Sequence, residues 1–197
     1  MAQKNAKPVI DGLSPFLSDV SGQALEIGSG TGQHVIAFSR AFPGLRWTPS
    51  EPEALHRASI DAWRLHAGVA IDPAISLDAA SNWAMLPAMA GILPLSLILT
   101  LNVIHISPFS VASGIVTGAG KTLAKGGLLA FYGPFKEGGE HTGQGNAVFD
   151  ARLRADNPNW GVGDVDDIAR IASQARLEQI ALLKMPANNR ILILQRQ

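Results

Sequence analysis

The stretch ALEIGSGTGQH, residues 24–34, passes from an apolar segment into three glycines that alternate with polar residues. Glycine is used where the backbone must take a positive φ or where another group must approach closely. Gly28, Gly30 and Gly32 therefore predict a turn built around a ligand, with the carboxylate of Glu26 just upstream. The alternative is a tight strand-to-helix turn without a ligand, because short motifs of this kind are weak alone.

The length and composition suit one compact domain. The chain has 197 residues, of which 47% are apolar and 16% charged. We expect a single domain over residues 1–197, with a substantial core. Lysine plus arginine and aspartate plus glutamate number 16 each. The net charge thus gives no reason to expect bulk binding to nucleic acid or to an anionic membrane.

The sequence contains no cysteine, which removes disulfides, thiolate nucleophiles and cysteine metal sites together. This composition fits a reducing compartment. The first residues, MAQKNAKPVIDG, lack the apolar run of a signal peptide, and Pro94 interrupts the most apolar stretch, GILPLSLILTLNVIHI. We therefore expect a soluble, cytoplasmic protein without a membrane span.

Strands alternate with helices along most of the chain. Apolar runs predict five strands, at residues 24–28, 45–50, 69–78, 94–106 and 128–133. The third is irregular because Pro73 interrupts it. The fourth is rich in leucine and isoleucine, as is typical of a strand buried on both faces of a parallel sheet. Helical patterns between these runs indicate βα units.

The end of the chain has a different pattern. A helical region continues to Arg176, and two apolar runs follow at 177–185 and 190–196, joined only by PANN. Two strands this close must pair antiparallel, since a parallel connection needs a crossover of about a dozen residues or more. The sequence therefore predicts an α/β fold: a Rossmann-like, doubly wound, seven-stranded sheet, mostly parallel, with a C-terminal antiparallel hairpin.

The glycine loop departs from the dinucleotide fingerprint. That fingerprint is G-x-G-x-x-G, whereas this loop has G-x-G-x-G, with Gln33 where the last glycine would fall. The C-terminal hairpin also does not continue a purely parallel dinucleotide fold. Both features favour a different adenosine-containing ligand, although an NAD-dependent oxidoreductase stays an alternative.

The run LEIGSGTGQH resembles the first motif of class I S-adenosylmethionine-dependent methyltransferases, and the seven-strand order with its hairpin resembles their fold. The strings ALEIGSGTGQH, WTPSEP, LNVIHISPF, YGPF, FDARLRADNPNWGVGD and MPANN, in this order, resemble the methyltransferase-like protein 26 family, a poorly characterised class I group. The resemblance covers nearly the whole chain. The first motif is specific to the superfamily, and the later strings together are specific to the family.

This resemblance implies where the cofactor S-adenosylmethionine would bind. The residues passing close under its methionine part would be Gly28, Ser29, Gly30, Thr31 and Gly32. Glu26 would approach its amino group, and an ammonium is a good partner for a partly desolvated carboxylate. The alternative for Glu26 is a solvated strand residue.

Three more cofactor positions follow at the ends of later strands. Glu51 comes about 20 residues after the glycines, where an acidic side chain meets ribose hydroxyls in this layout; a helix-end charge is its alternative role. Asp78 and Ala79 follow the third strand, where class I enzymes commonly hold adenine, although Asp78 also suits a helix cap. Asn102 would lie near the sulfonium.

Methyl transfer from a sulfonium is an in-line displacement whose leaving group needs no protonation, so the protein mainly aligns the reactants in a dry pocket. His105 is the nearest candidate base, because its free pKa is close to neutrality; a core histidine is the alternative. Tyr132 and His141 are candidates to line a substrate pocket. The asparagines of PANN suit the hairpin turn itself.

The segment NVIH departs from the N-P-P-Y type sequence of amide- and adenine-amino methyltransferases. Asn102 also offers no carboxylate for magnesium, so no metal is expected. The leading hypothesis is a methyltransferase acting on a small molecule or a peptide side chain. The alternatives are an S-adenosylmethionine-binding protein without catalysis and an NAD-dependent oxidoreductase.

Overall fold

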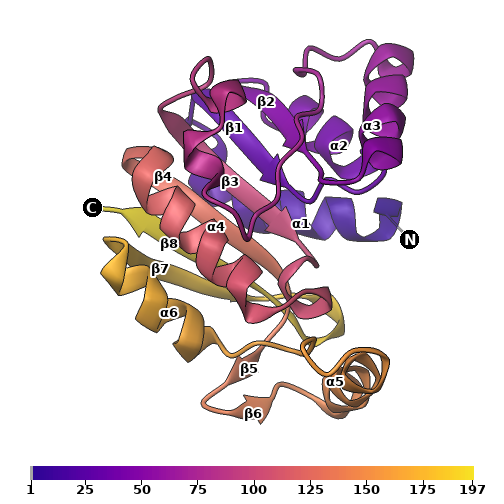
Figure 1. Cartoon of the computed structure of the whole chain (residues 1–197), viewed down its shortest axis with the longest axis vertical. Helices are drawn as coiled ribbons and strands as arrows, with labels where there is room; N and C mark the ends of the chain where they lie inside the picture. Colours follow the sequence, from indigo (N-terminus) through magenta and orange to yellow (C-terminus); the bar gives the residue numbers. More distant parts are fainter. Residues whose placement is uncertain (1) are drawn as a thin grey trace.

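A computed structural model describes residues 2–197 and shows a central sheet with helices on both of its faces (Figure 1). Within these residues, six strands form the sheet, in the order β2-β1-β3-β4-β8-β7. Their bounds are β1 Gly22–Ile27, β2 Leu45–Ser50, β3 Leu95–Leu101, β4 Leu123–Pro134, β7 Leu177–Lys184 and β8 Asn189–Arg196. A separate small hairpin consists of β5 Lys136–Glu137 and β6 Glu140–His141.

The helices fill the connections between the strands. The longer ones are α1 Ala2–Leu17, α2 Gln33–Ala41, α3 Ala54–Ala67, α4 Phe109–Thr122, α5 Gln144–Asp156 and α6 Val165–Gln174. Four short 3₁₀ turns among the described residues are η1 Trp83–Met85, η2 Pro87–Met89, η3 Ile104–Ile106 and η4 Pro186–Asn188. Each βα unit returns the chain to the same edge of the sheet, so the carboxyl ends of β1, β2 and β3 lie together.

Each face of the sheet has its own apolar core. On one face, α1, α2 and α3 supply residues such as Leu13, Phe38 and Ile60. On the other face, α4 and α6 supply residues such as Ile115 and Ile168. No helix within residues 2–197 combines the length and apolar character needed to cross a membrane.

The mostly parallel sheet and its C-terminal hairpin confirm the predicted fold class. Strand β1 pairs in parallel with β2 and β3, and β3 with β4. Strand β8 lies antiparallel between β4 and β7. The hairpin turn contains Ala187 and Asn188, both at φ 59°. The prediction that asparagine makes this turn is therefore confirmed for Asn188.

The predicted seven-strand count is wrong, because residues 69–78 do not form a strand. Ile75 makes only an isolated parallel bridge to Ser50. Its N–H donates to the Pro49 carbonyl at 3.0 Å, and its carbonyl accepts from the Glu51 N–H at 3.0 Å. Pro49 and Pro73 have no N–H to donate, so a regular ladder cannot form here. The segment follows the edge of the sheet without joining it fully.

Other element boundaries also differ from the prediction. The long apolar run at 94–106 is a strand only to Leu101, because Asn102 takes a left-handed φ of 56° and a 3₁₀ turn follows. The helical region before Arg176 is divided into α5 and α6. Helix α1 was not predicted, although its buried residues Val9, Leu13 and Leu17 have a spacing of four.

Candidate functional site

The glycine loop connects β1 to α2 at the carboxyl end of the sheet. Gly28, Gly30 and Gly32 have φ values of 73°, 54° and 93°. All three are in the left-handed region that favours glycine, which confirms the turn predicted from the sequence. The N–H groups of Gly28 and Ser29 donate to the Ser50 carbonyl, each at 3.0 Å, so the loop is held against the end of β2.

The three glycines differ in what surrounds them. A Cβ atom at Gly28 would collide with the Val103 side chain, and one at Gly32 would lie 2.8 Å from the Ile60 Cα. These two glycines are needed for packing. A Cβ at Gly30 would meet no protein atom within 4 Å. Gly30 therefore faces open space, and a side chain there would occupy room available to a ligand.

That space belongs to a cleft of about 630 Å³. Its lining residues come from the glycine loop, the end of β2, the start of α3 and the segment after β3: Gly28, Ser29, Gly30, Thr31, Gln33, His34, Glu51, Pro52, His56, Leu101, Asn102, Val103, Ile106 and Ser107. The volume is within the usual range for small-molecule and cofactor sites, roughly 300–1,000 Å³. The carboxyl edge of an α/β sheet is also where such folds bind ligands.

Glu26 is a buried carboxyl group at the base of this loop. The residue is only 2% exposed, and its Oε2 has no hydrogen-bond partner among the described residues. Burial raises the pKa of Glu26 to about 7; the Ser29 hydroxyl opposes this rise and the nearby Glu51 charge adds to it. Glu26 is therefore not a solvated strand residue. A cation reaching Oε2 would satisfy it and favour its charged form.

Glu51 directly follows β2 and lines the cleft. Its Oε2 accepts a hydrogen bond from the Gly30 N–H at 2.9 Å, and its Oε1 lies 3.6 Å from His56 Nδ1. Backbone pairing of Glu51 with Ile75 fixes the position of its Cα. The structure thus brings the two carboxyl groups predicted from the sequence near enough to interact, and Glu51 also holds the backbone of Gly30.

Asn102 also lines the cleft, whereas His105 and Tyr132 do not. The Asn102 N–H donates to the Tyr132 carbonyl at 2.8 Å. Tyr132 is buried, and its hydroxyl accepts from Asn189 Nδ2 at 2.9 Å. Neither His105 nor Tyr132 is among the residues that line the cleft.

His105 is a buried, neutral side chain. Its Nδ1 has no hydrogen-bond partner among the described residues, and burial lowers its pKa from 6.5 to about 4. A Cβ added to Gly133 would lie 2.8 Å from the ring carbon Cε1 of His105 and 3.4 Å from Asn102 Oδ1. Gly133 thus allows these two polar side chains to approach the end of β4.

Asp78 and Ala79 do not line the cleft. The Asp78 carboxylate accepts from the Ala80 N–H at 2.9 Å, which is an Asx turn and not the helix cap considered from the sequence, because the N-cap of η1 is Asn82. Ala79 is buried. Their role with adenine remains a prediction. His141 lies in β6 and pairs with Asp150, away from the lining of the cleft.

Sequence reasoning missed Gln33, His34, His56 and Ile106 as residues of the cleft. Gln33 and His34 open the helix directly after the glycines, and His56 lies five positions beyond Glu51. Their nearness in sequence to predicted residues was the available signal. Which of their faces turns to the cleft depends on the docking of α2 and α3.

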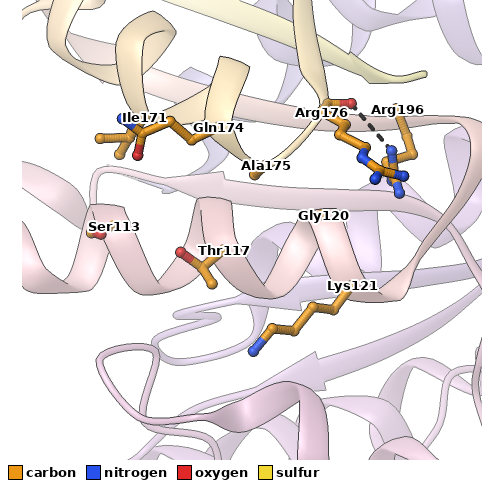
Figure 2. Close-up of a pocket in the computed structure, with 9 residues that line it drawn as sticks. All are labelled: Ser113, Thr117, Gly120, Lys121, Ile171, Gln174, Ala175, Arg176 and Arg196. Atoms are coloured by element: carbon orange, nitrogen blue, oxygen red, sulfur yellow. Dashed lines mark hydrogen bonds between the residues drawn. The ribbon is translucent and has the colours of Figure 1, made fainter.

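A second groove provides a contrast. Figure 2 shows it between α4 and α6, with a volume of about 370 Å³. Its lining residues are Ser113, Thr117, Gly120, Lys121, Ile171, Gln174, Ala175, Arg176 and Arg196. At its end, Arg196 donates to the Arg176 carbonyl at 3.4 Å. No residue that the sequence singled out for binding or catalysis lines this groove, so we take the cleft at the glycine loop as the candidate site.

Comparisons with known proteins agree with this fold. The family model described as "Protein of unknown function (DUF938)" matches residues 1–196. Among solved structures, the mitomycin 7-O-methyltransferase MmcR is similar, with a TM-score of 0.77 and 19% identity over 98% of this chain and 53% of that chain. An O-methyltransferase family protein from Burkholderia thailandensis has a TM-score of 0.80 at 14% identity, over 98% of this chain and 56% of that one.

A third similar structure is CalO1, a methyltransferase in calicheamicin biosynthesis, in its SAH-bound form. Its TM-score is 0.72 at 13% identity, over 98% of this chain and 54% of CalO1. The chain therefore spans about half the length of these solved structures. At such identities the likeness establishes the fold, a Rossmann-like methyltransferase fold.

Proposed function

The chain belongs to the DUF938 family, and we propose that it is an S-adenosylmethionine-dependent methyltransferase acting on a small molecule or a peptide side chain. The observation that carries this proposal is the open space at Gly30, which Glu51 holds by a hydrogen bond, together with the buried Glu26 carboxyl group whose Oε2 has no partner among the described residues. The three similar structures named above are described as methyltransferases, and one contains SAH.

The residues of the cleft, with the buried Glu26 at the end of β1, fit the cofactor in charge and in space. Glu26 would bind its ammonium group through the Oε2 atom that has no partner. The loop at 28–32 would pass under its methionine part, since only Gly30 leaves room there. Glu51 would accept hydrogen bonds from the ribose hydroxyls, and Asn102 would lie near the sulfonium. When bound, the cofactor supplies an electrophilic methyl group.

We assign the acceptor side of the reaction to the segment after β3 and the end of β4. For a hydroxyl acceptor, the bound cofactor would supply the methyl group that the acceptor oxygen takes. The acceptor proton must then leave. Neutral His105 is the proposed proton acceptor, and Tyr132, held by Asn189, is the proposed donor that orients the acceptor.

The alternative of cofactor binding without catalysis has one observation in its favour. The pKa of His105 is lowered to about 4, and its Nδ1 is enclosed. A base this weak takes a proton only from an acceptor that is already acidic or that loses its proton late in the transfer. Turnover with an acceptor separates the two functions, since both predict the same cofactor affinity.

Two finer assignments belong to this proposal. The strings that resemble the methyltransferase-like protein 26 family cover nearly the whole chain, and on them we place the protein in that group. The absence of cysteine supports a cytoplasmic location. Neither assignment changes the expected chemistry of the cleft.

The first experiment measures the melting temperature with S-adenosylhomocysteine. A ligand that binds only the native state stabilises it by about 2.7 kcal/mol at a hundredfold excess over its Kd. We expect a raised melting temperature, and we expect Gly30→Val to abolish the increase because the new side chain would fill the ligand space.

The matched control is Gly126→Val. Gly126 also has a left-handed φ, 81°, and no atom within 4 Å of an added Cβ, but it lies outside the cleft. Both variants thus carry similar backbone strain. Only Gly30→Val should lose the response to the ligand. A wild-type melting curve that does not move at millimolar ligand contradicts the cofactor assignment.

A further inference from the structure

Asp150, in α5, is a buried carboxylate that accepts from several donors at once. The Val162 N–H lies 2.7 Å from Oδ1, and Arg154 Nε lies 3.1 Å from the same atom. His141 Nε2 lies 2.9 Å and Lys136 Nζ 3.2 Å from Oδ2. Both oxygens of this carboxylate are therefore fully used within the protein.

The donors come from separate parts of one segment. Residues 136–164 leave the sheet after β4 and return to it at α6, and Figure 1 shows β5, β6 and α5 together at one end of the molecule. Lys136 is in β5, His141 in β6 and Val162 in the loop before α6. The segment is closed by a hydrogen bond from the Lys136 N–H to the Gly163 carbonyl, at 2.8 Å. Asp150 thus connects β5, β6, α5 and the loop before α6 to one another.

The same segment packs against His105. The Gly161 N–H donates to the His105 carbonyl at 3.0 Å. The Phe149 ring meets the His105 ring edge to face, with centroids 5.7 Å apart and planes at 72°. A Cβ at Gly161 would collide with the Arg154 guanidinium and with Asp150 Oδ1, so a glycine at this position leaves room for the Asp150–Arg154 ion pair. Two residues connect Asp150 to His105. Phe149 is the sequence neighbour of Asp150, and Gly161 precedes Val162, whose N–H donates to Asp150.

We propose that Asp150 is a positioning residue, which holds residues 136–164 against His105 and so builds the acceptor-side wall of the site. This role rests on the proposed function, because that function places the acceptor near His105. Asp150 touches neither the cleft nor the reacting atoms.

An alternative role for Asp150 is to form a general-base pair with His141, since their 2.9 Å contact would orient the imidazole. Lys136 and Arg154 share the same carboxylate and neutralise much of its negative charge. This leaves less charge to stabilise a protonated His141. The arrangement favours holding the segment over activating a base.

The test follows the His105 ring by NMR as the pH is lowered, without any ligand. In the wild-type protein we expect the ring to titrate near pH 4, because it is buried. Asp150→Asn keeps the shape but removes the charge, which should loosen the segment and expose the ring. We then expect His105 to titrate at least one pH unit higher, toward its ordinary value.

The control is Asp167→Asn, which removes an exposed ion pair with Arg170 and should leave the His105 titration unchanged. A His105→Gln spectrum assigns the resonance. If Asp150→Asn does not fold, His141→Ala removes a single donor and gives the same test with a smaller shift. A His105 titration that stays near pH 4 in the folded variants overturns the proposal.

S-adenosylhomocysteine affinity separates this proposal from the proposed function. The Kd should change by less than about twofold in Asp150→Asn, because the cofactor residues lie on other elements. A loss of tenfold or more would place Asp150 in the cofactor site and overturn its role as an acceptor-side residue. No wild-type binding, together with a shifted His105 titration, would contradict only the proposed function.

Discussion

Glu26 and Asp150 are both buried carboxyl groups, but they differ in their hydrogen-bond partners and in the direction of their pKa shifts. Asp150 receives donors from the Val162 backbone and three side chains. Burial raises its pKa, but these donors outweigh that effect and lower the pKa to about 2. Glu26 has an oxygen without a partner, and burial raises its pKa to about 7.

This difference separates a group that stabilises the fold from one that is suited to a ligand. A buried polar group normally finds a hydrogen-bond partner, so one that does not needs an explanation. In Asp150 the chain has supplied every partner itself. In Glu26 the described residues supply no partner for Oε2, and we expect a bound cation to supply it. Three predictions test this comparison.

The largest effect is expected for Asp150→Ala. Removing one partner of a buried ionic network leaves the others uncompensated, which costs about 3–5 kcal/mol of unfolding free energy. The Asp150 pKa lies below its unfolded value of 3.8, so its contribution is present above about pH 4 and is lost as the pH falls toward 2.

Urea unfolding at pH 7 and at pH 3 checks the Asp150 prediction. The difference between wild type and variant should shrink at the lower pH. A difference in unfolding free energy below about 1 kcal/mol at pH 7 would show that the contacts of Asp150 with its four donors do not stabilise the fold. Asp150 would then no longer differ from Glu26 in the way described above.

The second prediction is that Glu26→Gln raises the unfolding free energy, whereas Asp150→Ala lowers it. The Glu26 pKa lies above its unfolded value of 4.5, so ionisation destabilises the ligand-free protein as the pH rises from about 4.5 to 7. Glu26→Gln removes this titration. We expect the variant to exceed the wild type in unfolding free energy at pH 8 by about 3 kcal/mol, and to match it more closely at pH 5.

The same urea experiment at these two pH values measures the Glu26 effect. Isothermal titration with S-adenosylhomocysteine should show the reverse order, with Glu26→Gln binding more weakly because the neutral amide lacks the charge that pairs with an ammonium. Stability curves that run parallel across the pH range would contradict the assignment of an uncompensated buried carboxyl.

The smallest effect is expected for Glu51→Gln, which acts on binding alone. Its side-chain oxygen can still accept from the Gly30 N–H, so folding should change little. A charged acceptor of ribose hydroxyls should be worth about 1.5–3 kcal/mol, roughly ten- to a hundredfold in affinity. A helix-end charge would be worth only a few tenths of a kcal/mol.

Calorimetry with S-adenosylhomocysteine measures the Glu51 effect, and circular dichroism confirms the fold. Unchanged affinity would remove Glu51 from the ribose position and leave Glu26 as the only carboxylate with a proposed ligand contact.

The sequence alone determined the glycine turn, the alternation of strands and helices and the antiparallel end of the sheet. These features depend on short-range physics: the φ values open to glycine, the periodicity of apolar residues and the reach of a short connection. It also brought Glu26 and Glu51 to the same edge, because the carboxyl ends of parallel strands meet there. Pro73 predicted an irregular third strand, but only the structure showed that residues 69–78 make no more than an isolated bridge to the sheet.

Only the tertiary structure decided which polar groups have partners. Gly28, Gly30 and Gly32 cannot be told apart by their sequence. In the structure, Val103 packs against Gly28 and Ile60 against Gly32, and both of these neighbours are distant in sequence. The donors of Asp150 and the burial of His105 depend on how residues 136–164 fold back on the sheet. Burial and hydrogen bonding between distant segments set a group's pKa, and neither is written in local sequence patterns.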